Sequence, residues 1–521
     1  MKKSKKDIRR LCLLIILLLC IPLAQAVADE NVETDNFPSS NIIDDEWNKL
    51  LGGNNSDGAQ SIALTEDEGY IIGGLTKSYG SGSWDVWLIK TDKDGDMLWN
   101  KTFGGKEEDS AESVIQTEDG GYLLCGYTFS FGTGGADIWI IKTDDDGNML
   151  WNRTFGGENN DYGQSIIQTN DGGYAFIATT LSFGSTDNDR DIWLIKTDGN
   201  GDVMWDKIFG GSEVEWGSDL IQTNDGGYCI VGSTASYGAG GWDVWLLKLY
   251  ENGDVIWEKT IGGEGMDDGS CIEQTSDMGF IITGSSTSYS SGEWNDALLI
   301  KTDQNGNTQW INVFGDYVGK LAEDGGNSVI AAQDSYLIAG ITSSYDIGAF
   351  DAWLLKVDKQ GNEIWNKTFG GRERETANCV LQAKDGSYIV SGETNTYGQK
   401  KDVWLIKCQD YPPPEILIER PKQNYLYLFG KEILPIRQTI ILGGIIVTSE
   451  VYDLQNKIDR VEYYLTGQDY ETEPRIVIHS PPFNWEWTSS AFGLYEVTAG
   501  AYYGNAGGVA IDKIDVRIFI P

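Results

Sequence analysis

The stretch "IKTDDDGNMLWNRTFGG", Ile141 to Gly157, decides how this chain folds. Its centre, "DDDGN", offers the carboxylates of a calcium loop, but Asp, Asn and Gly also form hairpin turns because they tolerate positive φ angles. The element [DNQ]-G-[DN] recurs along the chain while the other acids change, as in "DKDGD" (92–96) and "DKQGN" (358–362). Since a calcium loop needs its ligands kept, we interpret the stretch as a turn between two strands. A weak calcium site is the alternative.

A tryptophan in the strand after each turn reveals a repeat. Spacings of 52, 52, 54, 52, 53 and 55 residues separate Trp47, Trp99, Trp151, Trp205, Trp257, Trp310 and Trp365. Each unit holds four short runs rich in Val, Ile, Tyr, Trp and Thr, which is typical of β-strands. Four strands in such a unit are typical of a propeller blade. We predict an all-β protein with a seven-bladed β-propeller, in which residues 45–53 supply the outer strand of the seventh blade.

Composition divides the chain into five segments. Residues 1–26 have a basic start, an apolar run and "AQA", which predicts a secretory signal peptide. The apolar run is shorter than the roughly 20 residues of a membrane span, so an uncleaved anchor is only the alternative. We expect an acidic flexible segment at 27–44, the propeller at 45–409, a proline-rich linker at 410–415 and a second β-domain at 416–521.

The repeated phrase "IKTDxxGxxxW" resembles the repeat of pyrroloquinoline-quinone-type (quinoprotein-like) propellers, and the "DGGY…G…DxWLIK" units resemble secreted repeat proteins of archaea and bacteria. The resemblance covers residues 45–408 and implies a scaffold rather than an activity. Quinone dehydrogenases of that class typically have eight blades and a vicinal cysteine pair, whereas this chain has seven predicted blades and no Cys-Cys. Residues 416–521 contain "VEYY", "PPFNWEW" and "AYYGNAGG", which resemble a bacterial Ig-like domain and imply a β-sandwich.

Charge and residue usage exclude several classes of function. The formal net charge is −40, and such an acidic chain repels nucleic-acid phosphates and anionic lipid. The single histidine, His479, lies outside the repeats, so the propeller cannot hold a Ser-His-Asp triad or a histidine metal site. The five cysteines after residue 26 are odd in number and widely spaced, which predicts buried thiols rather than disulfides or zinc ligands. We expect no cofactor apart from the calcium alternative.

Binding residues are expected on one face of the ring. Tight hairpins occupy one face, so the variable loops of the opposite face are better placed to bind a ligand. These loops combine aromatic residues with acids, which suits sugars and protein partners alike. Packing is the alternative for an aromatic residue that recurs in every blade. The candidate ligand-binding residues are Tyr79, Trp84, Asp161, Tyr162, Glu215, Trp216, Tyr237, Trp242 and Trp294.

Two other residue sets recur with the repeat. One aspartate opens the third strand of every blade, and its repetition predicts a structural hydrogen bond rather than catalysis. These aspartates are Asp85, Asp137, Asp191, Asp243, Asp296, Asp351 and Asp402. Four asparagines in N-x-S/T sequons are glycosylation candidates, unless they merely belong to the repeat. They are Asn54, Asn100, Asn152 and Asn366.

Taken together, these patterns predict a secreted or cell-surface protein. We expect it to bind a glycan or a surface protein, as in adhesion, without catalysis. One alternative is an extracellular polysaccharide-active enzyme that uses carboxylates at the channel mouth, because a glycosidase needs only two such groups. A purely structural envelope component is another. An asymmetric pair of acids at one mouth would favour the enzyme, whereas a flat aromatic patch would favour binding.

Overall fold

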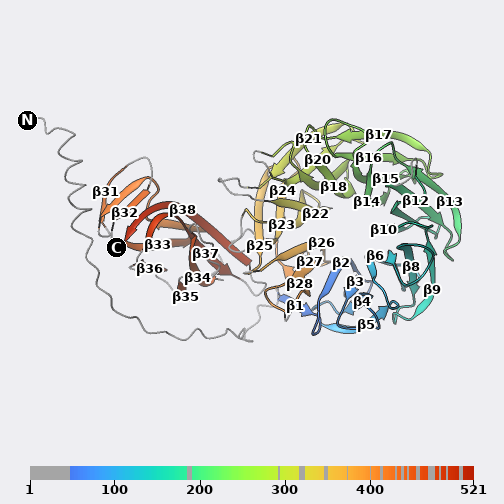
Figure 1. Ribbon diagram of the computed structural model, residues 1–521, viewed down its shortest axis with the longest axis horizontal. Coiled ribbons are helices and arrows are strands. Elements are labelled where there is room, and N and C mark those ends of the chain that lie inside the picture. Colours follow the sequence, from blue (N-terminus) through green and yellow to red (C-terminus); the bar gives the residue numbers. More distant parts are fainter. Residues whose placement is uncertain are drawn as a thin grey trace, which may run out of the picture.

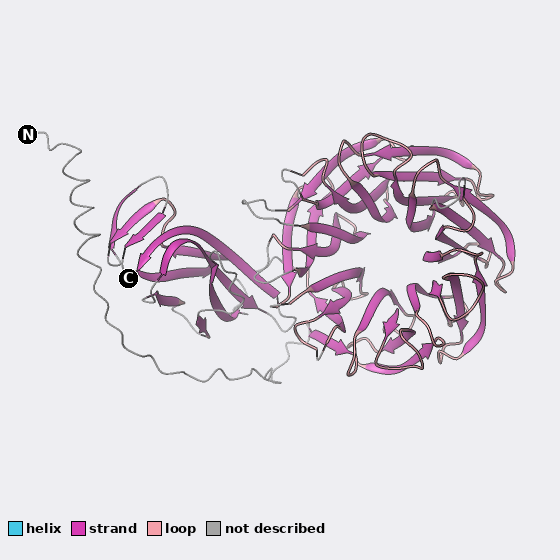
Figure 2. Cartoon of the chain, in the orientation of Figure 1, coloured by secondary structure: helices cyan, strands magenta, loops and turns pink. Residues whose placement is uncertain are grey.

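The computed structural model describes residues 47–184, 190–290, 294–315, 323–344, 350–371, 373–398 and 400–410, and in the C-terminal part 415–428, 431–435, 439–442, 445–452, 458–466, 476–479, 483–487, 491–503 and 508–520. Strands are the only regular elements in these residues, which contain no helix and hence none able to cross a membrane (Figure 2). The predicted signal peptide, the segment 27–44 and most of the linker lie outside the described residues.

Four-stranded antiparallel sheets repeat along the chain, as the sequence predicts. The first two are β2 (Asp57–Leu64), β3 (Tyr70–Thr76), β4 (Asp85–Thr91) and β5 (Met97–Phe103), then β6 (Asp109–Gln116), β7 (Tyr122–Thr128), β8 (Asp137–Thr143) and β9 (Met149–Phe155). The next is β10 (Asp161–Gln168), β11 (Tyr174–Thr180), β12 (Asp191–Thr197) and β13 (Val203–Phe209). Figure 1 shows the sheets around a ring, with the first strand of each toward the centre and the fourth at the rim.

The remaining repeat strands continue this series. They are β14 (Glu215–Gln222), β15 (Tyr228–Thr234), β16 (Asp243–Leu249), β17 (Val255–Ile261), β18 (Asp267–Gln274), β19 (Phe280–Ser286), β20 (Asp296–Thr302), β21 (Thr308–Phe314), β22 (Asp324–Ala331), β23 (Ser335–Thr342), β24 (Asp351–Asp358), β25 (Glu363–Phe369), β26 (Glu375–Gln382), β27 (Tyr388–Thr394) and β28 (Asp402–Cys408). The last sheet takes β1 (Trp47–Leu51) as its fourth strand, with Trp47 opposite Lys407. The start of the repeat region therefore completes its end.

The "DDDGN" stretch forms the turn between the third and fourth strands. Asp144 Oδ1 accepts the N–H of Asn148 at 2.7 Å, and Gly147 has a φ of 75°. Side-chain and backbone hydrogen bonds from Asn148 lower the pKa of Asp144. The equivalent aspartates of other repeats also accept turn amides: Asp92, Asp198, Asp303 and Asp358. The carboxylate that resembled a calcium ligand is therefore used by its own turn.

A buried lysine links the third strand of a sheet to the hairpin between its first two strands. The side chain of Lys196 is 3% exposed, and its Nζ lies 3.0 Å from Asp171 and donates to the Thr197 carbonyl at 2.8 Å. The same pair occurs as Lys90–Asp67, Lys142–Asp119, Lys248–Asp225, Lys301–Asp277 and Lys407–Asp385. Because a buried charge needs a partner, the "IKT" and "DGGY" motifs are two halves of one structural contact.

The rim tryptophans hold neighbouring sheets together. Trp99 of β5 packs against Tyr122 of the next sheet, with ring centroids 5.8 Å apart. It also covers Gly147, where an added Cβ would lie 2.6 Å from the indole ring. Trp47 makes the same contacts across the junction between the last and first sheets, 6.4 Å from Tyr70 and over Gly95. Strand β1 therefore closes the series by side-chain packing as well as by strand pairing.

The C-terminal part consists of two sheets around one core. One sheet contains β29 (Glu415–Arg420), β33 (Ile445–Tyr452) and β36 (Asn484–Trp487). The other contains β30 (Tyr425–Leu428), β31 (Lys431–Pro435), β32 (Thr439–Leu442), β34 (Ile458–Thr466), β35 (Ile476–Ile478), β37 (Ala491–Tyr503) and β38 (Gly508–Ile520). Val447 and Trp485 from the first sheet share a buried cluster with Tyr463 and Val516 from the second.

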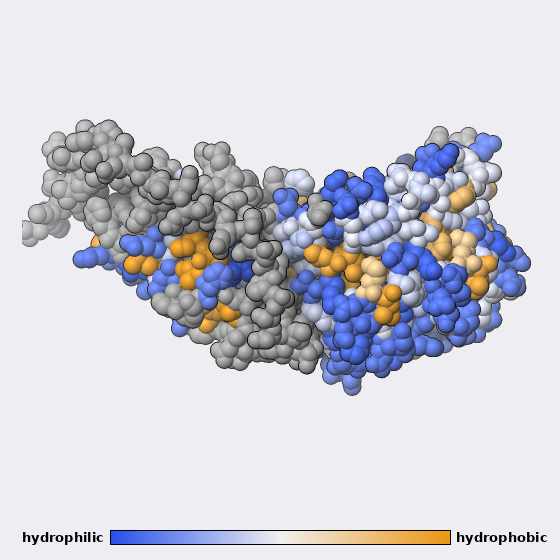
Figure 3. Space-filling view, turned by 90° about the horizontal axis from the view of Figure 1, so that it is seen from below, coloured by the Kyte–Doolittle hydropathy of each residue, from blue (hydrophilic) through white to orange (hydrophobic). Residues whose placement is uncertain are grey.

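This C-terminal part docks on the rim of the ring through β25. Strand β38 pairs antiparallel with β25, with Val509 opposite Thr368, and Thr368 Oγ1 donates to the Val509 carbonyl at 3.1 Å. Other rim strands begin with exposed apolar pairs, among them Met97–Leu98 and Met149–Leu150. Figure 3 shows such apolar patches on the side of the ring. The end of the outer edge of β25, at Thr368 and Phe369, is thus covered by the chain itself.

We predict that closure of the ring depends on Leu51 and not on its neighbour Leu50. Leu51 is 8% exposed and belongs to the core cluster between the last and first sheets, whereas Leu50 is 41% exposed. Leu51→Ala should lower the free energy of unfolding by about 2–4 kcal/mol because it leaves a cavity. Leu50→Ala should change it by about 0.5 kcal/mol or less. Denaturant unfolding of both variants tests this, and equal effects would contradict it.

We also predict acid unfolding driven by the lysine–aspartate pairs. Burial alone would raise the pKa of Asp171, but hydrogen bonds from Thr169, Lys196 and Gly173 lower it to about 2. The pKa values of Asp277 and Asp385 are also lowered to about 2. An unfolded aspartate has a pKa of about 3.9, so this stabilisation is present above that value and is lost as pH falls toward about 2.

The measurement is the thermal midpoint from pH 6 to pH 2 for the wild type and for the triple variant Asp171→Asn, Asp277→Asn, Asp385→Asn. The variant should melt lower at pH 6 and should lose less stability on acidification. The general loss of negative charge is nearly the same in both proteins, so it does not account for a difference. Parallel curves would show that these pairs do not control the acid response.

Candidate functional site

The first residue of each innermost strand is buried and fully used by the fold. Asp161, which opens β10, is 0% exposed. Its carboxylate accepts hydrogen bonds from Thr180 Oγ1, Ser182 Oγ at 2.6 Å and Gly157 N at 3.0 Å. Glu215 has the same place in β14 and accepts from Thr234 Oγ1 and Gly211 N, both at 2.8 Å. The structure therefore puts these two predicted ligand-binding residues inside the fold, where their carboxylates accept structural hydrogen bonds.

The aspartates that open the third strands also bind the backbone. Asp137 Oδ2 accepts the N–H of Thr133 at 2.7 Å, and Asp243 Oδ2 accepts that of Ala239 at the same distance. Burial raises the pKa of Asp137, and the nearby charge of Asp161 adds to this. These bonds hold in place the loops between the second and third strands of each sheet, in agreement with the structural role expected from the repetition.

Two predicted aromatic contacts belong to the repeat as well. Tyr79 packs on Trp87 with ring centroids 5.3 Å apart, and its hydroxyl donates to the Gly52 carbonyl at 2.9 Å. Tyr237 packs on Trp245 at 5.5 Å and donates to the Gly210 carbonyl at 3.0 Å. Both rings remain about two-fifths exposed, at 41% and 43%, but their edges and hydroxyl groups are committed to loop packing.

Trp84 and the acids of neighbouring sheets form an asymmetric group at the loop face. Lys77 Nζ lies 4.4 Å from the centroid of the Trp84 ring, and Lys401 Nζ lies 5.7 Å from it. Lys401 also forms an ion pair with Glu393 at 2.9 Å. These residues belong to the first and last sheets, so the group spans the closure of the ring.

Two glutamates lie beside this closure. Glu393 lies over Gly58, where an added Cβ would sit 2.2 Å from its Oε1. Glu112, on the next innermost strand, accepts hydrogen bonds from Ser110 Oγ at 2.7 Å and Gln60 Nε2 at 3.3 Å. Burial raises the pKa of Glu112, and the negative charges of Glu393 and Glu108 raise it further.

Aromatic side chains continue the group on the far side of Glu112. The Tyr127 hydroxyl donates to Glu108 Oε1 at 2.9 Å, and the Tyr127 ring meets Tyr162 edge to face at 5.1 Å. We call the connected residues Trp84, Lys401, Glu393, Glu112, Tyr127 and Tyr162 the mouth arc. All six side chains are partly exposed. The arc therefore combines two glutamates with three aromatic side chains.

The other predicted aromatic residues lie outside the mouth arc. Arg190 stacks over Trp216 with its guanidinium carbon 5.4 Å from the ring centroid. Trp242 is partly exposed and its carbonyl accepts the N–H of Asp267 at 2.7 Å. Trp294 is 43% exposed. Within the described residues, no hydrogen bond, ion pair or ring contact connects these three side chains to the arc, so they stay separate binding candidates.

Glu112 and Glu393 were not among the predicted binding residues, because the predictions were confined to the loops. Glu112 and Glu393 lie on strands β6 and β27. Their sequence signal is departure from the repeat: the positions equivalent to Glu112 hold Gln60, Gln164, Ser218, Ser270, Asn327 and Asn378, and those equivalent to Glu393 hold Leu75, Tyr127, Thr179, Ser233, Ser285 and Ile341. Glutamate occurs once at each position.

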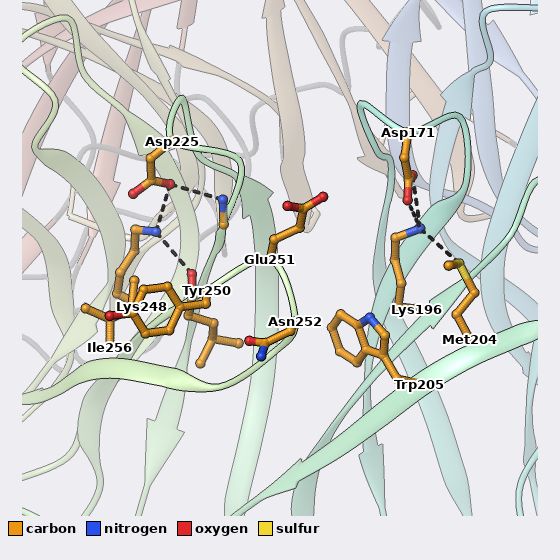
Figure 4. Close-up of a pocket in the computed structure, with 12 residues that line it drawn as sticks. Asp171, Lys196, Met204, Trp205, Asp225, Lys248, Tyr250, Glu251, Asn252 and Ile256 are labelled. Carbon is orange, nitrogen blue, oxygen red and sulfur yellow. Dashed lines mark hydrogen bonds and ion pairs between the residues drawn. The ribbon is translucent and has the colours of Figure 1, made fainter.

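A hollow lies on the opposite, hairpin face. It has a volume of about 670 Å³ between the third and fourth sheets in chain order, and its lining includes Trp205, Tyr250 and Glu251. Figure 4 shows Trp205 and Tyr250 on opposite sides, with Glu251 and Asn252 between them. The lysine–aspartate pairs of both sheets lie above. No residue of this hollow was among the predicted contacts.

The asparagine sequons, the cysteines and the metal question have simple structural settings. The Oδ1 atoms of Asn100 and Asn152 accept indole N–H groups from Trp87 and Trp139, and Asn366 binds Glu363. Asn54 is exposed in a loop; glycosylation at all four stays a prediction. The five cysteines are free thiols, three of them buried. Among the described residues, no three His, Cys, Asp or Glu side chains gather as a metal site.

No model of a protein family matches the sequence, and no curated protein is significantly similar to it. Solved structures that match include the polysaccharide lyase Uly1, at 11% identity over 73% of this chain and 94% of that one, with a TM-score of 0.42. Endo-1,5-α-L-arabinanase from Thermotoga petrophila RKU-1 matches at 11% identity over 70% of this chain and all of that one, with a TM-score of 0.28. A thermostable family-43 glycoside hydrolase covers 47% of this chain and 89% of its own at 14% identity and a TM-score of 0.30.

These matches correct one expectation from the sequence. We expected no catalysis, yet these three matching structures are a glycoside hydrolase, a polysaccharide lyase and an arabinanase. The expectation rested on the missing histidines, and that argument excludes only histidine-dependent chemistry. At these TM-scores the likeness concerns the kind of fold alone, so the activity must be argued from the side chains of this chain.

Proposed function

We propose that this protein is a secreted or cell-surface seven-bladed β-propeller with a C-terminal Ig-like module, and that it binds and cleaves a polysaccharide at the mouth arc. The fold proposal is supported by the seven tryptophan repeats and by β1 acting as the fourth strand of the last sheet. The Ig-like proposal is supported by two sheets that share one core. Secretion is supported by the signal-peptide pattern of residues 1–26.

The observation that carries the activity is that Glu393 lies near enough to Glu112 for its negative charge to raise the pKa of Glu112. Glycoside hydrolysis uses two carboxyl groups, one that donates a proton and one that acts as a base or nucleophile. Partial burial and the neighbouring acids raise the pKa of Glu112, which favours the protonated form needed by an acid. Glu393 forms an ion pair with Lys401 at 2.9 Å, which places a positive charge beside its carboxyl group. The two environments thus separate the roles.

The proposed reaction follows from these roles. Glu112 donates its proton to the glycosidic oxygen as the bond to the anomeric carbon breaks. Glu393 takes a proton from the water molecule whose hydroxyl group ends on that carbon. Trp84, Tyr127 and Tyr162 offer apolar ring surfaces to the sugar. A neutral polysaccharide suits the net charge of −40 better than a uronate chain, which favours hydrolysis over the elimination reaction of a lyase.

We predict that Glu112→Gln and Glu393→Gln each lower polysaccharide cleavage by about 10²–10⁴-fold, as expected for loss of an acid–base group. The assay exposes residues 27–521 to neutral polysaccharides and measures released reducing ends. Glu107→Gln is the matched control, because Glu107 is an exposed acid in the adjacent loop. Absence of release by the wild type, or full release by Glu112→Gln, would reject the proposal.

The pH profile gives a second prediction. The negative charge of Glu108 contributes to the raised pKa of Glu112. Glu108→Gln removes that charge, so the pKa of Glu112 should fall and the acid should lose its proton at lower pH. The alkaline limb of kcat/KM should therefore move to lower pH in this variant. An unmoved limb would mean that another group supplies the proton.

A further inference from the structure

Tyr250 departs from the repeat at a position where the fold needs no tyrosine. In five other repeats this turn position holds the aspartate whose Oδ1 accepts the turn amides: Asp92, Asp144, Asp198, Asp303 and Asp358. Around Tyr250 the backbone keeps the same turn, with Tyr250 N donating to Asp254 O at 2.8 Å and Gly253 N donating to Tyr250 O at 3.0 Å. Asn252 Oδ1 accepts the Asp254 N–H at 3.1 Å and so replaces one bond of the missing carboxylate.

The Tyr250 ring therefore takes no part in the hydrogen bonds of the turn. It is 58% exposed and lines the hollow of about 670 Å³ on the hairpin face. Trp205 forms the facing wall (Figure 4). The indole ring of Trp205 packs against Tyr228, with ring centroids 6.0 Å apart. It also packs against Gly253, where an added Cβ would lie 2.7 Å from the ring. A hollow of ligand size is thus lined by a rigid aromatic side chain on one side and an exposed one on the other.

Polar groups lie between the two rings. The carboxylate of Glu251 projects between them and makes no hydrogen bond or ion pair with the described residues (Figure 4). Lys248 Nζ uses two bonds, to Asp225 Oδ1 at 3.0 Å and to the Leu249 carbonyl at 3.2 Å, although an ammonium group carries three N–H donors. The hollow therefore offers an acceptor and a donor as well as two ring faces.

We propose that this hollow is a second glycan site, which binds a short segment of a neutral polysaccharide. A sugar ring has apolar C–H faces that can pack on Trp205 or Tyr250, and hydroxyl groups that can bond to Glu251 and Lys248. The charge of the surroundings selects against anions, because the chain carries −40 and the hollow adds Asp171, Asp225 and Glu251 against two lysines. The ligand class is therefore a neutral polyhydroxylated chain.

The position of this site separates it from the mouth arc. Asp171 and Asp225 lie in hairpins between the first and second strands of their sheets, and Tyr250 lies in a turn between a third and a fourth strand. The arc, in contrast, lies where the first and third strands begin. In antiparallel four-stranded sheets these are opposite ends of the strands. The second site therefore holds substrate without entering the reaction, and it stands even if the arc has no activity.

The test is affinity gel electrophoresis of the Glu112→Gln protein, residues 27–521, in gels containing hydroxyethylcellulose, yeast mannan or linear arabinan. Polygalacturonate serves as the anionic comparison. At least one neutral polymer should retard the protein, and Tyr250→Asp should weaken that affinity by about tenfold, the size of one lost aromatic contact. Tyr250→Phe should keep the affinity because it keeps the ring.

Tyr250→Asp is also a folding control, because it restores the residue that the other turns use. Its thermal midpoint should equal or exceed that of the parent protein. Glu251→Gln is a second variant at an exposed position, and it should weaken retardation without changing the midpoint. When Trp84→Ala is added to the Glu112→Gln protein, Tyr250→Asp should still weaken retardation by the neutral polymer.

Three results would overturn the proposal. They are retardation by no neutral polymer, equal retardation of the parent protein and Tyr250→Asp, and stronger retardation by polygalacturonate than by any neutral polymer. Loss of retardation with Trp84→Ala alone would assign the binding to the mouth arc instead.

Discussion

A tryptophan at the rim of one sheet, packed on the turn glycine and the tyrosine of the next, is the contact on which the ring depends. Among the described residues, neighbouring sheets of the ring share no strand ladder. A backbone hydrogen bond links adjacent sheets, as from Asp267 N to the Trp242 carbonyl at 2.7 Å, and side-chain packing supplies the rest of the contact. Near the ring centre, backbone N–H groups supply a second set of links: Val114 N donates to Ser61 Oγ at 3.2 Å, and Ile272 N donates to Asp219 Oδ2 at 3.1 Å. Rim packing and central hydrogen bonds together fix the angle between sheets.

These repeated contacts also decide where function can lie. A side chain that recurs in every sheet is already committed to its own turn, loop or neighbour, as Asp161, Tyr79 and the buried lysines are. A ligand site needs groups that the scaffold does not use. Glu112, Glu393 and Tyr250 each occupy a repeat position once and leave the local backbone unchanged. Asymmetry in an otherwise repeated fold is therefore the most direct indication of its working residues.

The fold was predictable because its information is local. Strand length, turn glycines and the tryptophan spacing all lie within one unit, and the orphan strand at Trp47 completes the count. The mouth arc was not predictable in this way, because Gln60 and Glu112 are 52 residues apart and Lys401 and Trp84 meet across the closure. The burial of Asp161 and Glu215 was not predictable either. The sequence predicted that both acids lie in loops, whereas in the structure a strand begins at each of them.

The distribution of positive charge connects the scaffold to its proposed substrate. The chain has 39 basic residues against 79 acidic ones, and six of its lysines are used inside the sheets to bind hairpin aspartates. The surface left to solvent is therefore strongly acidic and repels anionic polymers over several ångströms. Lys77 and Lys401 do not belong to the six lysines inside the sheets. Both stack on Trp84, and Lys401 also forms an ion pair with Glu393. Cations at the arc thus orient a carboxylate rather than attract an anion, which is the arrangement that a neutral sugar chain requires.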